Sequence, residues 1–112
     1  MTIDLPIRCF CGALRGVVRD VCSNRGHRLV CYCDDCQSFA HFLGRADQIL
    51  DSHGGTDILQ MSPARLQITG GAEHLACMRL TAKGLLRWYT DCCKTPIGNT
   101  VSTRQVPFVG LI

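Results

Sequence analysis

The sequence has few aromatic residues, few lysines and no long apolar run. Aromatic residues make up 6% of the 112 residues, and only two residues are lysine. No stretch approaches the roughly 20 apolar residues that a membrane-spanning helix needs. The N-terminus has neither the basic start nor the apolar segment of a secretory signal. We therefore expect one cytoplasmic domain over residues 1–112, with a modest apolar core and no membrane partner.

The positive charge is small and scattered along the chain. Twelve basic residues stand against nine acidic ones, which gives a formal net charge of +3. The arginines form no basic run interleaved with aromatic residues, the pattern of a nucleic-acid-binding surface. The sequence therefore indicates no nucleic-acid partner, although single arginines could bind an anionic small molecule. Nothing in the pattern sets the oligomeric state.

Cysteine, in contrast, is abundant, with nine residues in the chain. In so short a protein this number indicates either the disulfide framework of a secreted domain or a metal site. The lack of a secretory signal favours metal, and the odd number argues against complete pairing. A domain of this size buries only about two thirds of its unfolded surface. Bound metal would therefore contribute substantially to stability.

Short apolar segments separated by glycine-containing turns predict a β-rich fold. Phe39, Phe42 and Leu43 recur at helical spacing and predict one short helix over residues 34–43. The expected fold class is mainly β, a small zinc-containing β-sandwich of antiparallel strands with this one short helix. Residues 106–112 would be a final strand or the cut end of a longer, C-terminally truncated protein. The other strands are expected at residues 13–19, 27–33, 56–61, 66–69, 74–80 and 85–90.

The run Cys-Tyr-Cys-Asp-Asp-Cys places Cys31, Cys33 and Cys36 within six residues. A tight turn carrying Cys-x-x-Cys can direct two thiolates to one zinc ion, and Cys31 would share a strand face with Cys33. One alternative is three buried apolar thiols. Another is a redox dithiol at Cys33 and Cys36, which the two aspartates disfavour because their charge opposes a free thiolate.

A second cluster combines Cys9 and Cys11, in Cys-Phe-Cys-Gly, with Cys92 and Cys93 near the other end of the chain. The glycine lets the backbone turn closely around an ion, and the late pair precedes a Lys-Thr-Pro turn. The alternative is two unrelated pairs of thiols. If the four residues do meet, they predict a second metal site assembled from distant parts of the sequence.

The remaining candidates carry weaker signals. Among the histidines, His41 is the best candidate for facing a substrate, because it lies on the expected helix after the three-cysteine motif. The others have packing or surface roles as their ordinary explanation. They are the isolated thiols Cys22 and Cys77, the histidines His27, His53 and His74, and the strand residues Trp88 and Tyr89.

In order, these motifs resemble a known family. Cys-x-Cys-Gly at residues 9–12, Cys-x-Cys-x-x-Cys-Gln at residues 31–37 and a late strand leading into paired cysteines are similar to the glutathione-dependent formaldehyde-activating enzyme and centromere protein V family. The resemblance extends over residues 7–100. It implies a β-rich protein with two Zn²⁺ ions. By motif, the structural site would comprise Cys9, Cys11 and the late cysteines Cys92 and Cys93, and the catalytic site Cys31, Cys33 and Cys36.

One departure from the family concerns its late motif, Phe-Cys-x-x-Cys-Gly-Thr. Here the corresponding residues read Tyr-Thr-Asp-Cys-Cys-Lys-Thr, so Thr90 stands where the first late cysteine is expected and Cys93 keeps the second position. Adjacent side chains on an extended strand point in opposite directions. Cys92 can therefore join Cys93 on one ion only if the backbone turns between them. Otherwise the site has three sulfurs and another ligand.

Two functions are compatible with these motifs, and the resemblance favours the first. In the first, the catalytic zinc keeps an open position for a small thiol such as glutathione, whose sulfur attacks formaldehyde to give S-hydroxymethylglutathione, a carbon-sulfur lyase-like reaction in reverse. The second is a non-catalytic zinc-stabilised binding module, favoured if Asp35 or a histidine fills the fourth position. In the enzyme, the carboxylates of the tripeptide could be bound by Arg79, Lys83 or Arg87.

Overall fold

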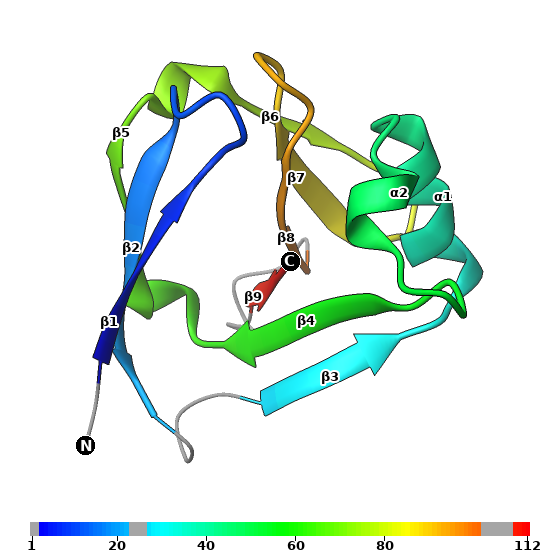
Figure 1. The fold of residues 1–112 in the computed structure, drawn as a ribbon, viewed down its shortest axis with the longest axis horizontal. Helices are drawn as coiled ribbons and strands as arrows, with labels where there is room; N and C mark the ends of the chain where they lie inside the picture. The colour runs from blue at the N-terminus through cyan, green and yellow to red at the C-terminus, as the bar shows by residue number, and fades with distance from the viewer. Residues whose placement is uncertain (1–2, 23–26, 102–108) are drawn as a thin grey trace.

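The computed structural model describes residues 3–22, 27–101 and 109–112, and this part of the chain forms two antiparallel sheets (Figure 1). The smaller sheet has the strand order β1-β2-β5 and the larger has the order β3-β4-β9-β8-β7-β6. The strands are β1 (Ile3–Arg8), β2 (Arg15–Val21), β3 (His27–Cys31), β4 (Thr56–Met61), β5 (Leu66–Gly70), β6 (Leu75–Met78), β7 (Leu86–Thr90), β8 (Pro96–Thr100) and β9 (Val109–Leu111).

The mainly β class with antiparallel pairing is confirmed, and six expected strands correspond to β2 to β7. The sequence did not reveal β1 and β8, because each contains a proline that is usually a turn signal. Pro6 lies in the edge strand β1 and Pro96 is the first residue of β8, two places where a missing amide donor is tolerated. The expected last strand is represented by β9, and residues 106–108 lie outside the described residues.

The expected helix is α1 (Asp34–Phe42), which follows the three-cysteine motif. Cys33 caps it, because its sulfur accepts a hydrogen bond from the amide of Cys36 at 3.4 Å. Gly44 ends the segment with a φ of 68°, a left-handed conformation that glycine adopts without strain. A further helical turn, α2 (Ala46–Ile49), was not expected. None of the helices in the described ranges is long and apolar enough to cross a membrane.

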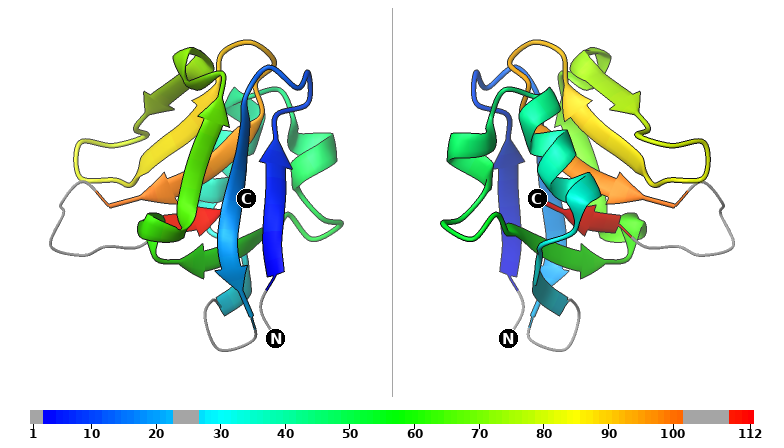
Figure 2. Two further views of the ribbon diagram at one scale, coloured as in Figure 1. Left: turned by 90° about the vertical axis from the view of Figure 1, so that its left-hand side faces the viewer. Right: turned by 90° about the vertical axis from the view of Figure 1, so that its right-hand side faces the viewer.

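The smaller sheet lies beside the larger one (Figures 1 and 2). Two apolar clusters combine side chains of both sheets. The first cluster joins Val18 of the smaller sheet to three buried residues of the larger one. The second contains the buried side chains of Cys9, Leu14 and Ile97, with Cys93 packed against them. Two of the candidate metal ligands therefore lie at the edge of the core, where a bound ion would link the sheets.

Aromatic contacts attach α1 to β7. Tyr89 on β7 lies edge-on to Phe39 and Phe42 of the helix, with ring centroids 6.3 and 5.6 Å apart. Such edge-to-face pairs add to the free energy gained from burial alone. This packing brings the first turn of α1, and with it Cys36, against the β7 residue Arg87.

Candidate metal centres

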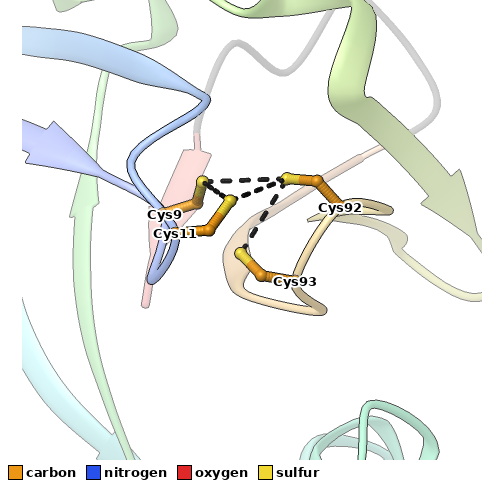
Figure 3. Close-up of side chains that lie close together, drawn as sticks. All are labelled: Cys9, Cys11, Cys92 and Cys93. Carbon is orange, nitrogen blue, oxygen red and sulfur yellow. Dashed lines mark hydrogen bonds between the residues drawn. The ribbon is translucent and has the colours of Figure 1, made fainter.

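Four cysteine sulfurs gather between the loop after β1 and the turn after β7 (Figure 3). Sγ of Cys92 lies 3.8 Å from that of Cys9, 3.5 Å from that of Cys11 and 3.9 Å from that of Cys93. The sulfurs of Cys9 and Cys11 are 3.6 Å apart, and all four lie within 4.8 Å of one another. We call this group the four-cysteine centre. It could hold a metal ion.

A turn after β7 brings both late cysteines into this centre. The amide of Lys94 donates to the carbonyl of Thr90, and the amide of Thr90 donates to the carbonyl of Thr95, each at 2.9 Å. Lys94 has a left-handed φ of 57°, so the chain is not extended here. Cys92 and Cys93 therefore point to the same place, and the second possibility, three sulfurs with another ligand, is not the arrangement found.

Hydrogen bonds surround the sulfurs of the four-cysteine centre. The amide of Leu14 donates to Sγ of Cys9 at 3.3 Å, and the Thr95 hydroxyl lies 3.0 Å from Sγ of Cys93. Burial raises the pKa of Cys93, but hydrogen bonding with Thr90 and Thr95 outweighs it and lowers the pKa to about 5. A thiolate is the form that binds metal, so these contacts favour coordination.

The three sulfurs of Cys31, Cys33 and Cys36 form a second group, here called the three-cysteine centre. Sγ of Cys31 lies 3.3 Å from that of Cys33 and 3.4 Å from that of Cys36. Cys31 ends β3, Cys33 caps α1 and Cys36 lies in its first turn. In the described part of the chain, no histidine or carboxylate, Asp35 included, completes the group. The centre could therefore hold a metal ion through three sulfurs.

Arg87 lies against this centre from β7. Its side chain is buried, and Nη1 donates to Sγ of Cys36 at 3.6 Å. Burial raises the pKa of Cys36 to about 12, by more than the contact with Arg87 lowers it. The sequence suggested Arg87 as a ligand for a substrate carboxylate, but its guanidinium contacts a sulfur. Arg79 and Lys83 are exposed, and Nη1 of Arg79 donates to the carbonyl of Ala82.

A third candidate group shares a ligand with the four-cysteine centre. His74, Asp91 and Cys92 offer ligand atoms within 4.8 Å of one another, and Nδ1 of His74 lies 3.7 Å from a carboxylate oxygen of Asp91. His41, the histidine favoured by its place in the sequence, is exposed on α1 and joins no such group among the described residues. The pairing of β6 with β7 places His74 beside Asp91, whose amide donates to the carbonyl of His74 at 2.9 Å, and no local sequence signal reveals it.

The two centres lie at opposite ends of β7. Arg87, near its start, contacts Cys36, and the turn after its last residue carries Cys92 and Cys93. The helical segment is also linked to this turn, because Nη2 of Arg45 donates to the carbonyl of Cys93 at 2.6 Å. None of the seven cysteines of the two centres is in a disulfide among the described residues, so no disulfide competes for their sulfurs.

Comparison with known proteins supports the fold and assigns the family. No curated protein matches the sequence. A crystal structure of a Rhodobacter sphaeroides protein, a structural-genomics target, superposes with a TM-score of 0.63. It is 16% identical and covers 96% of this chain and 83% of that one, so the likeness concerns the fold alone. The profile of a family of unknown function, DUF6151, matches residues 1–112, and the chain therefore belongs to that family.

Proposed function

We propose that the protein binds two zinc ions and catalyses a carbon-sulfur lyase-like reaction on a glutathione adduct. The observation that carries the proposal is the difference between the two centres. One offers four sulfurs, a complete set for a structural zinc site, and the other offers three. Catalytic zinc sites commonly have three protein ligands and keep the fourth position for water or substrate.

Zinc is the metal that the sulfur arrangement favours. Thiolate ligands select zinc or iron-sulfur clusters over hard cations. Four sulfurs placed tetrahedrally at about 2.3 Å from one zinc ion lie about 3.8 Å from one another. In the four-cysteine centre, the three distances among the sulfurs of Cys9, Cys11 and Cys92 and the distance from Cys92 to Cys93 are 3.5 to 3.9 Å. All four sulfurs lie within 4.8 Å of one another, so these distances are close to those around a single tetrahedral ion.

The three-cysteine centre is accessible to an external thiol. Cys33 is exposed and Cys36 is buried, so the sulfur group extends from the protein surface to the base of α1. When bound, a zinc ion supplies a Lewis-acidic position at which a fourth sulfur is held as a thiolate. In the proposed reaction the thiol sulfur adds to the carbonyl carbon of formaldehyde and its proton ends on the carbonyl oxygen. No oxidant or reductant is needed.

Protein purified without chelator should contain two zinc ions per chain, one for each of the two cysteine centres. Elemental analysis and native mass spectrometry measure the ratio. Cys36→Ser should contain one ion, because serine does not replace a thiolate ligand of zinc. A zinc content near zero, with disulfides in its place, would falsify the metal assignment. Equal zinc content in wild type and Cys36→Ser would show that the three-cysteine centre binds no zinc.

Glutathione should bind the zinc-loaded protein through its sulfur and release a proton near neutral pH. The ordinary pKa of a cysteine thiol is about 8.5, whereas a coordinated thiol is deprotonated. S-methylglutathione keeps the charges of the peptide but has no ionisable sulfur, so it should bind much more weakly. Calorimetry in buffers of different ionisation enthalpy measures the proton directly.

Catalysis is a separate step of the same test. With formaldehyde present, exchange NMR should show faster interconversion of glutathione and its hydroxymethyl adduct with wild type than with Cys33→Ser. If both peptides bind equally well, or neither binds at millimolar concentration, the thiol-binding mechanism fails. A non-catalytic zinc-stabilised binding module then replaces the enzyme as the function.

A further inference from the structure

Arg87 is a buried cation. The residue is only 3% exposed, and it lies on β7, an interior strand of the larger sheet next to the edge strand β6. Burying an unpaired charge is costly, so buried arginines normally face a carboxylate or another anion. In the described ranges, none of the ion pairs includes Arg87. An arginine without a carboxylate partner requires another source of negative charge.

Among the described residues, the contacts given for Arg87 are to side chains without a formal charge when Cys36 is a neutral thiol. Its guanidinium carbon lies 5.7 Å from the centre of the Phe39 ring, and Nη1 contacts Sγ of Cys36. Asn99, the residue opposite Arg87 on the neighbouring strand β8, is neutral and buried. Its Oδ1 has no hydrogen-bond partner among the described residues. A ring face attracts a cation but does not neutralise it. The anion must therefore come from the sulfurs.

A metal-thiolate centre would provide that negative charge. Three thiolates and one divalent ion carry a net charge of −1, and the guanidinium makes the sum zero. We propose that Arg87 is a positioning residue that neutralises the metal centre of Cys31, Cys33 and Cys36 through its contact with the Cys36 sulfur. This inference rests on the proposed function insofar as a metal ion must bind there. It adds the residue that balances the charge and orients one ligand.

The same charge bears on the fourth ligand. An external thiolate would bring the ion and its four sulfurs to a net charge of −2, and Arg87 reduces this to −1. Without Arg87 the anionic ligand would enter a low-dielectric site of greater negative charge. Arg87 therefore favours an anionic sulfur at the fourth position, although its guanidinium does not contact the ligand's carboxylates.

Metal affinity tests the proposal directly. Arg87→Met keeps much of the side-chain volume and removes the charge, and Arg87→Lys keeps the charge. Co²⁺ titration of the purified protein, followed by sulfur-to-metal absorption, reports both centres, and the signal lost in Cys33→Ser identifies the three-cysteine centre. Loss of a hydrogen-bonding partner behind a metal ligand typically costs 10–100-fold in affinity. We expect a fall of roughly that size in Arg87→Met and partial recovery in Arg87→Lys.

The control is Arg19→Met, which changes an exposed arginine of the smaller sheet whose partners are Gln67 and Asp4. Its Co²⁺ affinity should equal that of wild type. If wild type binds no metal at the three-cysteine centre, the proposed function and this inference both fail. If wild type and Arg87→Met bind Co²⁺ equally well, only the role of Arg87 is overturned.

A double-mutant cycle separates this role from ordinary packing. Thermal melts compare Arg87→Met in the zinc-loaded wild type with Arg87→Met in the Cys33→Ser background, which keeps the four-cysteine centre. In wild type the substitution should lower Tm, because the metal centre loses its counter-charge. In Cys33→Ser it should leave Tm unchanged or raise it, because a buried charge without a counter-ion is removed. Equal losses of Tm in both backgrounds would show that Arg87 acts only through packing.

Discussion

Cys9→Ser should unfold the domain, whereas Cys36→Ser should leave most of the fold intact. Cys9 is fully buried in the second core cluster, and its sulfur lies 3.8 Å from that of Cys92, a residue 83 positions further along the chain. An ion bound there joins the first strand of one sheet to the turn after β7 in the other. The three-cysteine centre joins residues only 5 positions apart.

The two centres should stabilise the fold by different amounts, because they close loops of different length. The entropy of closing a flexible loop grows as (3/2)RT ln n, which gives about 4 kcal/mol for 83 residues and about 1.5 kcal/mol for 5. Metal binding to the folded state supplies the free energy that holds such a loop closed. A domain has a total stability of only roughly 5–15 kcal/mol. Loss of the long closure, together with a polar hydroxyl in the core, therefore removes a large share of that stability.

Circular dichroism, thermal melts and zinc content measure the outcome. Cys9→Ser should show no cooperative melt, and Cys36→Ser should melt cooperatively with one ion bound. Cys77→Ser, at an exposed cysteine that belongs to no metal-ligand group among the described residues, is the matched control and should resemble wild type. Similar collapse of Cys9→Ser and Cys36→Ser would contradict the division into a structural and an accessible centre.

The three-cysteine centre could be predicted from the sequence because its geometry is local. Cys33 is the N-cap of the helix and Cys36 lies in its first turn, so the start of the helix places both sulfurs in one group. The aromatic residues that mark the helix in the sequence also attach it to β7. One short segment of the sequence therefore contains both the cysteine motif and the aromatic residues that attach it to β7.

The four-cysteine centre could be predicted only in part. The sequence indicated that Cys9, Cys11 and the late cysteines meet, but it did not decide between Cys92 and another ligand. That choice depends on the left-handed conformation of Lys94 and on the hydrogen bonds across the turn. Lysine rarely adopts positive φ, so a lysine at this position does not predict the turn.

The position of Arg87 was not predictable for a different reason. An arginine in a β-strand next to aromatic residues normally indicates a side chain that reaches solvent. Its contact with Cys36 results from the packing of α1 on β7, two elements far apart in the sequence. The charge relation between the guanidinium and the thiolates exists only after both elements have formed.

Gly71→Ala should strongly destabilise the fold. Gly71 has a left-handed φ of 75°, which costs an L-residue roughly 1–2 kcal/mol. A Cβ there would overlap the carbonyl oxygen of Ala13 and lie 2.8 Å from Cα of Leu14, and both neighbours are backbone atoms. Because backbone cannot move aside as a side-chain tip can, we expect a loss of about 3 kcal/mol, on the order of 10 °C in Tm.

The displaced segment leads directly to the four-cysteine centre, because the amide of Leu14 donates to Sγ of Cys9. Gly71→Ala should therefore weaken zinc at this centre and spare the three-cysteine centre, which chelator competition followed by native mass spectrometry would resolve. The matched control is Gly70→Ala, one residue earlier. A Cβ at Gly70 meets no atom within 4 Å, and its φ is not positive. This substitution should leave Tm unchanged or raise it slightly. If both alanines had the same effect, the close approach of Gly71 to residues 13–14 would not be what positions the Cys9 loop.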